Sequence, residues 1–149
     1  MEKYDTLKLE NQLCFPLYAA AKELVRHYGP FLEKLDLTYT QYITMMVLWD
    51  RGGINVKELG KRLYLDSGTL TPLLKKLETK GLIRRERAKE DERQLQVCLT
   101  KKGEKLRDKA LAVPPQIASC VELKPEEAGM LYTLLYKVLA GFSEEPAAG

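Results

Sequence analysis

Two helical patterns separated by a three-residue turn constrain the fold of this chain more than any other feature. The first, over residues 56–63, places its apolar side chains on one face of a two-turn helix. Asp66 then begins a second helix as its N-cap, with leucines on either side as a hydrophobic staple, and Gly81 closes it. The sequence therefore predicts a helix-turn-helix whose second helix spans about residues 67–80.

Pro72 leaves the start of this second helix open, because proline lacks the N–H that an interior helical position donates. Either the first turn is irregular or the helix proper begins nearer Thr69. Two extended segments follow, 82–88 and 94–100, joined by the charged tip KEDER, and they predict a two-stranded hairpin. Helix, tight turn, helix and hairpin in this order form a winged helix-turn-helix, whose second helix fits the DNA major groove.

The charge distribution indicates a polyanionic partner. Residues 57–107 hold 15 Lys and Arg against 8 Asp and Glu, whereas the rest of the chain holds 9 against 13, within a net charge of +3. A basic middle between acidic ends is typical of a nucleic-acid-binding face on a scaffold that does not itself touch the polyanion. A purely structural surface helix and basic hairpin are the alternative, but element order and charge together favour double-stranded DNA.

The predicted DNA-contacting residues lie on the second helix and the hairpin. Short hydroxyl side chains suit base edges or phosphates, lysines suit phosphates, and arginines of the hairpin can reach the adjacent minor groove. Asp91 is predicted to orient Arg93 through a charge-assisted hydrogen bond. The complete set is Ser67, Thr69, Thr71, Lys75, Lys76, Arg84, Arg85, Arg87, Lys89, Asp91 and Arg93.

The segments on either side are predicted to be helical, so the expected fold is mainly α with a small β-hairpin. Pro16 implies a late start or a kink in the first helix, and Gly29-Pro30 its end. Pro114-Pro115 are expected to interrupt the helix that Thr100 caps. The expected helices cover about residues 8–28, a short turn at 30–36, 39–51 behind a Thr38–Gln41 capping box, 101–113, and a last helix from about 124.

One compact domain is expected from 149 residues that are 45% hydrophobic. We expect a DNA-binding lobe at 54–100, with 1–36 and 101–149 forming a helical dimerisation region. No apolar run suits a signal peptide or a membrane span, so we expect a cytoplasmic protein without a membrane partner. One histidine and the lack of phosphate-loop, metal and hydrolase motifs predict no cofactor, no metal site and no enzyme activity.

Several stretches resemble the MarR family of transcriptional regulators. The segment LYLDSGTLTPLLKKLETKGLIRRERAKEDERQLQVCLTKKG is similar to the winged helix of that family, including its Asp-x-Arg wing tip, and the resemblance covers nearly the whole chain. LENQLCFPLYAA, HYGPFLEKLDLTYTQY and LDSGTLTPLLKKLE look most similar to the OhrR branch, repressors that sense organic hydroperoxides through one N-terminal cysteine. The terminal helices are left over for a homodimer interface, and a two-fold dimer matches a pseudo-palindromic operator. Our hypothesis is that oxidation shifts the interface helices, changes the spacing of the two recognition helices and so releases the operator.

The resemblance identifies Cys14 as the redox-sensing residue. Its neighbours one turn away on the predicted helix include no cation, so help for a thiolate must come from elsewhere in the fold. In similar proteins tyrosine hydroxyls reach the cysteine, partly across the dimer interface, and the matching positions here are Tyr28 and Tyr39, with Tyr18 a weaker candidate. Phenol donors stabilise a thiolate. Core or interface packing is the alternative role for each tyrosine.

Oxidation of Cys14 would give a sulfenic acid that a second thiol can condense with. The resemblance to two-cysteine OhrR proteins implies Cys120 as the resolving residue, bonded across subunits, whereas a one-cysteine sensor capped by a small cellular thiol stays open. Cys98 is predicted to face away from the core as a bystander. Four other functions remain: a MarR-type repressor released by a small aromatic ligand, a one-cysteine global redox or virulence regulator, a thiol peroxidase, and a protein-binding winged helix.

Overall fold

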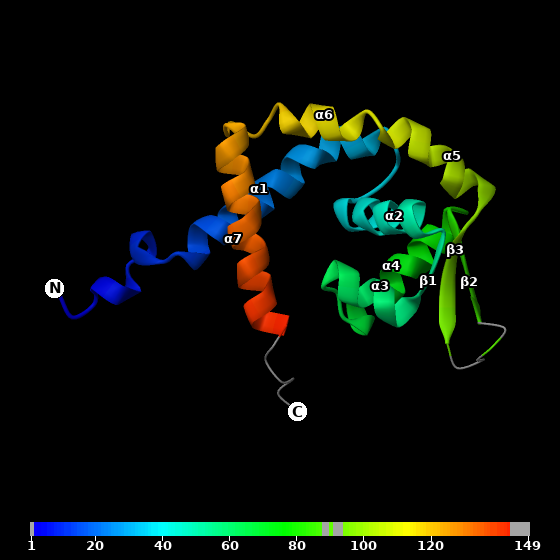
Figure 1. Ribbon diagram of the computed structural model, residues 1–149, viewed down its shortest axis with the longest axis horizontal. Coiled ribbons are helices and arrows are strands. Elements are labelled where there is room, and N and C mark those ends of the chain that lie inside the picture. Colours follow the sequence, from blue (N-terminus) through cyan, green and yellow to red (C-terminus); the bar gives the residue numbers. More distant parts are fainter. Residues whose placement is uncertain (1, 88–89, 91–93, 144–149) are drawn as a thin grey trace. The chain divides into compact units, whose positions relative to one another are not determined.

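The computed structural model describes residues 2–87, 90 and 94–143 (Figure 1). The chain forms two compact units, one up to Ile117 and one from Ala118, which are described separately. After 3-10 turns at Asp5–Leu7 and Leu9–Asn11, the elements are α1 (Cys14–Glu33), α2 (Tyr39–Arg51), β1 (Gly53–Asn55), α3 (Val56–Leu63), α4 (Ser67–Thr79), β2 (Ile83–Arg87), β3 (Leu95–Leu99), α5 (Lys101–Ala110) and α6 (Val113–Ala118). The second unit contains α7 (Pro125–Ser143).

The predicted fold class is confirmed, but the small sheet has three strands instead of the two of the predicted hairpin. β3 lies in the middle, antiparallel to β2 and to β1, with Ile54 opposite Val97. The sequence analysis did not predict the pairing of β1, because so short a strand shows no alternation that points to a partner. We call β1, α3, α4, β2 and β3 together the winged lobe.

α1 begins and ends later than the predicted helix. It starts at Cys14, so the predicted late start is confirmed, and Pro16 falls in the first turn, where backbone N–H groups have no helical partner. Gly29-Pro30 was wrongly predicted to end the helix. The helix continues to Glu33 and includes the first residues of the segment that was expected to form a separate turn. Leu32, only 1% exposed, anchors this last turn in the core, and its burial outweighs the one backbone hydrogen bond that proline removes.

Prolines in two later helices also behave differently from the sequence expectation. Pro72 lies inside α4, which begins at Ser67 and is not delayed to Thr69. The Pro-Pro pair at 114–115 was predicted to interrupt a helix, but it opens α6 instead, and the break falls before it. Proline is tolerated in the first turn of α6 because the N–H there has no intrahelical acceptor. Pro72 is the sixth residue of α4 and lies beyond the first turn, so it removes one backbone hydrogen bond of that helix.

The core lies where α2, α4 and the sheet meet, and capping side chains fix the helices around it. The predicted capping box is confirmed: Thr38 Oγ1 accepts the Gln41 N–H, and Gln41 Oε1 accepts the Thr38 N–H at 3.1 Å. Leu48 of α2, Leu77 of α4 and Val97 of β3 are fully buried. Because these residues come from three segments far apart in the sequence, the same core that holds α2 also orients α4 and the sheet.

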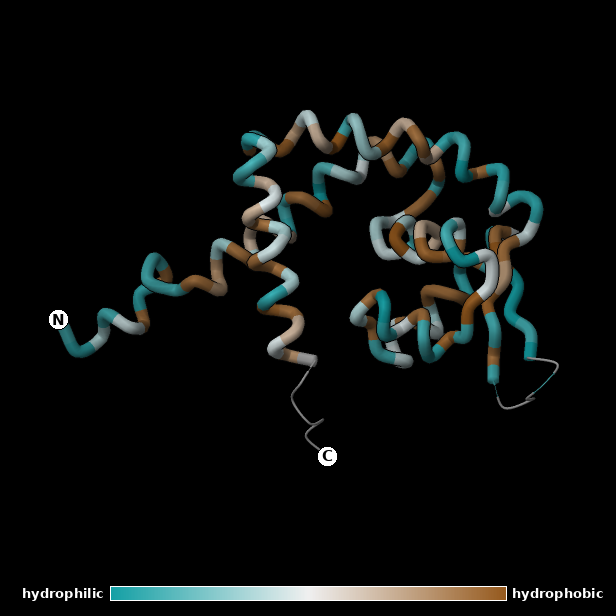
Figure 2. The backbone as a smooth tube through the Cα atoms, in the orientation of Figure 1, coloured by the Kyte–Doolittle hydropathy of each residue, from teal (hydrophilic) through white to brown (hydrophobic). Residues whose placement is uncertain are grey.

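Two helical surfaces stay apolar and exposed in the described chain. Figure 2 shows hydrophobic positions recurring along α7 and the first half of α1. The exposed side chains are Phe15, Leu17, Tyr18, Leu24 and Val25 on α1, and Met130, Leu131, Tyr132, Leu134, Tyr136, Val138 and Phe142 on α7. Contiguous apolar surface of this kind marks an interaction site. Among the described residues, no helix is both long and apolar enough to cross a membrane.

Candidate functional site

α4 turns its leucines into the core and its hydroxyl and lysine side chains outward. Leu70, Leu73, Leu74 and Leu77 are buried. All five predicted contact residues of this helix are exposed: Ser67, Thr69, Thr71, Lys75 and Lys76. An α-helix with its side chains is about 10–12 Å wide, and the DNA major groove is about 12 Å wide, so this outward face has the dimensions that major-groove reading requires.

The start of α4 is fixed by its cap and by a tight preceding turn. The Asp66 carboxylate accepts the Thr69 backbone N–H at 2.8 Å, and this hydrogen bond lowers the pKa of Asp66. Tyr64 makes the turn with a left-handed φ of 56°. Gly60 lets α3 approach that turn, since a Cβ there would lie 2.9 Å from the Leu65 carbonyl oxygen. The exposed face of α4 is therefore presented at a fixed angle.

Arg85 ties the wing to α4. Its backbone N–H donates to Glu78 Oε2 at 2.9 Å, and its Nη2 donates to Glu78 Oε1 at 3.2 Å. These hydrogen bonds lower the pKa of Glu78. The sequence singled out Arg85 only as a DNA contact, and nothing in the strand pattern revealed this partner on the preceding helix. The arginine therefore positions β2 against α4 whatever else it touches.

The other described arginines of the wing are exposed. Arg84 Nε lies 4.0 Å from Glu86 Oε2, and both side chains are more than half exposed, so this ion pair contributes little to stability. Arg87 is also exposed and lies at the end of β2. Both side chains are accessible to a polyanion. The remaining predicted wing contacts, Lys89, Asp91 and Arg93, lie outside the described residues.

Cys14 is the first residue of α1 and is exposed. The sequence analysis placed the helix at about residues 8–28 with a late start or a kink at Pro16, and the structure shows the late start. At a helix start the backbone N–H groups lack intrahelical acceptors, and the helix dipole favours negative charge. Pro16 was the signal behind the expected late start, and it lies in the first turn, where proline is favoured.

Three tyrosines from α1 and α2 form a cluster in the first unit. The Tyr28 ring centroid lies 4.9 Å from that of Tyr39 and 5.8 Å from that of Tyr42, and the last two are 6.5 Å apart. Burial raises the pKa of all three. Their hydroxyls therefore stay protonated and able to donate. Tyr42 was missed by the sequence analysis, although its spacing of three from Tyr39 places both on one helix face.

A single chain does not bring Cys14 and the tyrosine cluster together. Tyr28 follows Cys14 by 14 residues on the same helix, which at 1.5 Å per residue is about 21 Å. Tyr18 lies one turn from Cys14, but its side chain is 64% exposed and it is not part of the cluster. Contact between this thiol and the cluster therefore requires a second chain.

The other two cysteines have different surroundings. Cys120 is exposed and lies between α6 and α7, in the second unit. Cys98 lies on β3, where its Sγ donates to Glu86 Oε1 at 3.5 Å. Burial and that carboxylate raise the pKa of Cys98, which lowers its reactivity because the thiolate is the nucleophile. None of the three cysteines is in a disulfide.

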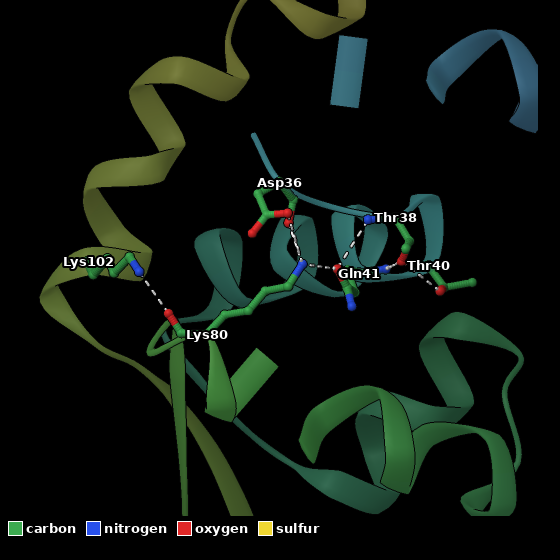
Figure 3. A network of polar contacts seen from close by, with 6 residues as sticks. All are labelled: Asp36, Thr38, Thr40, Gln41, Lys80 and Lys102. Atoms are coloured by element: carbon green, nitrogen blue, oxygen red, sulfur yellow. Dashed lines mark hydrogen bonds and ion pairs between the residues drawn. The ribbon is translucent and has the colours of Figure 1, made fainter. Parts of the chain in front are cut away.

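A polar network joins the end of α4 to the start of α2 (Figure 3). Lys80 Nζ donates to Gln41 Oε1 at 3.0 Å and also to the Asp36 carbonyl oxygen. The same Gln41 oxygen accepts the N–H of Thr38, the residue before Tyr39. Gln41 is only 3% exposed, so the hydrogen bonds to its side chain are partly protected from water. The end of α4 is thereby held to the start of α2, which carries two of the clustered tyrosines, Tyr39 and Tyr42.

The winged helix-turn-helix with an exposed hydroxyl and lysine face on α4 defines a class of protein, the DNA-binding transcription factors. Comparison with known proteins agrees with this class. Residues 26–110 match the family described as transcriptional regulator SarA/Rot. The chain is also 46% identical over 137 residues to an organic hydroperoxide resistance transcriptional regulator of Bacillus subtilis (strain 168), covering 92% of this chain and 93% of that protein.

Solved structures show the same relationship. AbfR of Staphylococcus epidermidis is one structural relative. Its reduced form bound to DNA is 33% identical to this chain with a TM-score of 0.74, and the match covers 95% of this chain and 99% of that one. Disulfide-formed AbfR is 34% identical with a TM-score of 0.63, covering 92% and 96%. A MarR mutant from E. coli complexed with operator DNA is 25% identical with a TM-score of 0.81, covering 93% and 99%. The chain belongs to the SarA/Rot family of transcriptional regulators, as an OhrR-like member of the MarR-type winged-helix proteins.

Proposed function

We propose that this transcriptional regulator is a cytoplasmic, dimeric repressor that senses organic hydroperoxides by oxidation of Cys14 and then releases its operator. The observation that carries the proposal is the exposed thiol at the first residue of α1, in a chain that matches an organic hydroperoxide resistance regulator along 92% of its length. The cytoplasm follows from the proposed partner, because a repressor acts where the chromosomal DNA is.

DNA reading rests on α4 and the wing. In this proposal the outward face of α4, with Thr71 and Lys75 one turn apart, enters the major groove of double-stranded DNA, while Arg84 and Arg87 approach the adjacent minor groove. Lysines bind phosphates and set the register, whereas hydroxyls contact base edges. The related AbfR and MarR proteins are solved with DNA, which supports the same mode of binding here.

The exposed apolar faces of α1 and α7 support dimerisation. A homodimer built from residues 1–36 and 101–149 would cover these side chains and present two copies of α4 with two-fold symmetry. Such a dimer reads a pseudo-palindromic operator whose half-sites lie about 34–36 Å apart. A change in the spacing of the two helices then breaks the fit to both half-sites together.

The proposed sensing reaction is a two-electron oxidation of sulfur. The Cys14 thiolate attacks the outer oxygen of the hydroperoxide, the O–O bond breaks, and the departing alkoxide takes up a proton to leave as an alcohol. Cys14 becomes a sulfenic acid. Since Cys14 and Tyr28 lie about 21 Å apart along one α1, we assign the stabilising phenols, Tyr28 and Tyr39, to the other subunit. Tyr18, near Cys14 on its own helix, is the weaker candidate.

Cys120 is the proposed resolving residue. Its thiolate attacks the Cys14 sulfur, an S–S bond forms between subunits, and the sulfenic oxygen leaves as water. The related AbfR is solved in a disulfide-formed state, which supports disulfide chemistry in this family. A one-cysteine sensor is the second candidate, favoured by the exposure of Cys14 to small cellular thiols. In both schemes one oxidation inactivates one regulator, so the chain is not an enzyme.

The polar network offers a route from the tyrosines to α4. A shift of Tyr39 displaces its neighbour Thr38, whose N–H shares the Gln41 oxygen with Lys80 at the end of α4. Small movements at a sensor are amplified when a packed element has two discrete positions. We therefore propose that oxidation of Cys14 changes the position of the recognition helix, α4, through these hydrogen bonds.

Non-reducing electrophoresis combined with gel-shift titration tests the proposal. After treatment with an organic hydroperoxide, the wild type should form a covalent dimer and lose operator affinity, whereas Cys14→Ser should do neither. Cys120→Ser should lose the covalent dimer, and Cys98→Ser, the matched control, should behave as the wild type. Unchanged operator affinity of the oxidised wild type rejects the redox function.

The same variants separate the remaining alternatives. Release by a small aromatic ligand would persist in Cys14→Ser, because it needs no thiol. A thiol peroxidase would consume many equivalents of hydroperoxide per chain in the presence of a dithiol reductant, whereas a sensor consumes about one. A protein-binding winged helix would lack the steep loss of DNA affinity with salt that counterion release produces.

A further inference from the structure

A pocket in the first unit lies against the end of α4 and one face of α5, and it shares Asp36 and Lys80 with the polar network. Its volume is about 360 Å³, near the lower end of the range typical of small-molecule sites. Three leucines form its apolar part and charged side chains form the rest: Leu35, Leu82 and Leu106, with Asp36, Lys80, Lys102, Lys105 and Lys109. The pocket contains neither Cys14 nor any of the clustered tyrosines.

The charges around this pocket are unbalanced, with four lysines against one aspartate. Two of the lysines are already engaged: Lys80 with Gln41 and Asp36, and Lys102 with the Lys80 carbonyl oxygen at 2.8 Å (Figure 3). Lys105 and Lys109 have no hydrogen-bond or ion-pair partner within the described part of the chain. Like charges four residues apart destabilise a helix, so an anion between them would relieve this repulsion.

DNA binding does not account for this cluster. In a helix-turn-helix the first residues of the recognition helix contact the bases, whereas this pocket uses the opposite end of α4. Lys80 follows Ser67 by 13 residues, which is about 20 Å along the helix. The lysines of α5 and the leucines beside them are therefore available to a ligand with both an anionic group and an apolar group.

We propose that this pocket binds a small alkyl carboxylate. The carboxylate lies between Lys105 and Lys109 as a charge-assisted hydrogen-bond acceptor, and the alkyl chain packs on Leu35, Leu82 and Leu106. An alkyl chain fits better than an aromatic ring because no aromatic side chain lines the pocket. Lys80, at the end of the recognition helix, lines the same pocket.

The only tryptophan of the chain lies beside this pocket and provides a signal. Trp49 Nε1 donates to the Gly103 carbonyl oxygen at 2.9 Å, one residue from Lys102. We would titrate the reduced full-length protein with sodium octanoate, following tryptophan fluorescence and confirming the stoichiometry by calorimetry. The expected result is saturable binding of one octanoate per chain. Absence of saturable binding overturns the proposal.

Matched variants test the role of the lysines. Lys105→Gln with Lys109→Gln should weaken octanoate binding at least about 10-fold, the loss expected for a charge-assisted contact. Lys57→Gln with Lys101→Gln removes the same net charge from exposed sites outside the pocket and should leave binding unchanged. Equal weakening in both double variants means that only overall charge matters, and it overturns the proposal. Circular dichroism of each variant checks that the helices are intact.

Two further arms test the chemistry of the ligand. Octan-1-ol has the same chain without the charge and should bind at least about 10-fold more weakly than octanoate. Equal binding of the alcohol, or binding only to anionic lipid vesicles and not to octanoate in solution, overturns the proposal. Since neither peroxide nor operator DNA enters these measurements, their failure leaves the proposed redox function untouched.

Discussion

The winged lobe and the first half of α1 differ in how far one chain completes their packing. In the winged lobe, every leucine on the inner face of α4 is buried, and the wing is tied back to α4 through Glu78 and Arg85. In α1, residues before Tyr28 contribute nothing to the buried core, and Phe15 and Leu17 are each 42% exposed. The apolar side chains of the winged lobe are packed within one chain, whereas those in the first half of α1 need a partner surface to bury them.

This difference assigns separate physical roles to the two regions. A region whose side chains are packed within the chain keeps its geometry whatever its oligomeric state. A region that needs a partner is sensitive to anything that alters the partner, including a modified sulfur at its first residue. In the proposed mechanism, oxidation of Cys14 therefore changes assembly without unfolding the winged lobe.

The largest expected effect is a loss of stability from a substitution in the core of the winged lobe. Leu77→Ala removes a fully buried side chain of α4 and should lower the free energy of unfolding by about 2–5 kcal/mol, because it leaves a cavity in the core. Urea denaturation followed by circular dichroism measures the loss. Leu17→Ala, on the exposed face of α1, is the control. A similar loss for both variants at a concentration where the protein is monomeric would contradict the comparison.

The next effect concerns the partner-dependent surfaces. Leu134→Asp places a charge on the exposed apolar face of α7 and should raise the dimer dissociation constant at least about 100-fold, because each dimer would bury two unpaired charges. Sedimentation velocity over a dilution series measures it, and operator affinity should fall in parallel. Lys137→Asp, a charge change on the same helix, should dimerise normally. A Leu134→Asp protein that stays dimeric would remove α7 from the interface.

Sequence reasoning worked best where a local signal names a local structure. The Asp66 cap, the Thr38 capping box and Gly81 located α4 and α2 correctly because each signal acts within a few residues. Gly29-Pro30 misled because burial of Leu32, a tertiary effect, outweighed a local one. The pairing of β1 was missed for the same reason, since it depends on a strand some 40 residues later along the chain.

The site shows the same limit. The outward residues of α4 were predictable because helical periodicity separates them from the buried leucines. The Glu78–Arg85 pair and the third tyrosine at 42 were not, because both arise where two elements meet. The distance from Cys14 to Tyr28 became meaningful only once α1 was seen to run unbroken between them.

A smaller effect is expected from the Glu78–Arg85 pair, which ties β2 to α4 within the winged lobe. The hydrogen bonds from Arg85 hold the pKa of Glu78 below its ordinary 4.5, so the pair contributes stability above that pH and loses it as the pH falls through the folded pKa. Glu78→Gln should therefore melt a few degrees below the wild type at neutral pH, with the difference shrinking below about pH 4.5. Thermal melts between neutral and acid pH test this. A difference that stays constant across that range would mean that ionisation of Glu78 does not matter.

The smallest effect concerns the tyrosine cluster, which lies between the buried core and the exposed first half of α1. Burial raises the pKa of Tyr28, and the neighbouring hydroxyls of Tyr39 and Tyr42 raise it further. Tyr42→Phe keeps the ring and removes one of these causes, so the pKa of Tyr28 should move down towards its ordinary 10.0. Alkaline titration of tyrosinate absorbance measures the shift, with Tyr4→Phe as an exposed control.

The direction of this shift bears on the proposed hydrogen bond to the Cys14 thiolate, because only a protonated phenol can donate to it. A tyrosine whose folded pKa is raised contributes stability below pH 10 and loses it as the pH rises through the folded pKa, so the cluster favours protonated phenols. Protonated phenols donate, and a thiolate accepts. If Tyr42→Phe titrates as the wild type does, the three rings do not act as one cluster. Stabilisation of Cys14 would then rest on the other subunit's Tyr28 and Tyr39 individually.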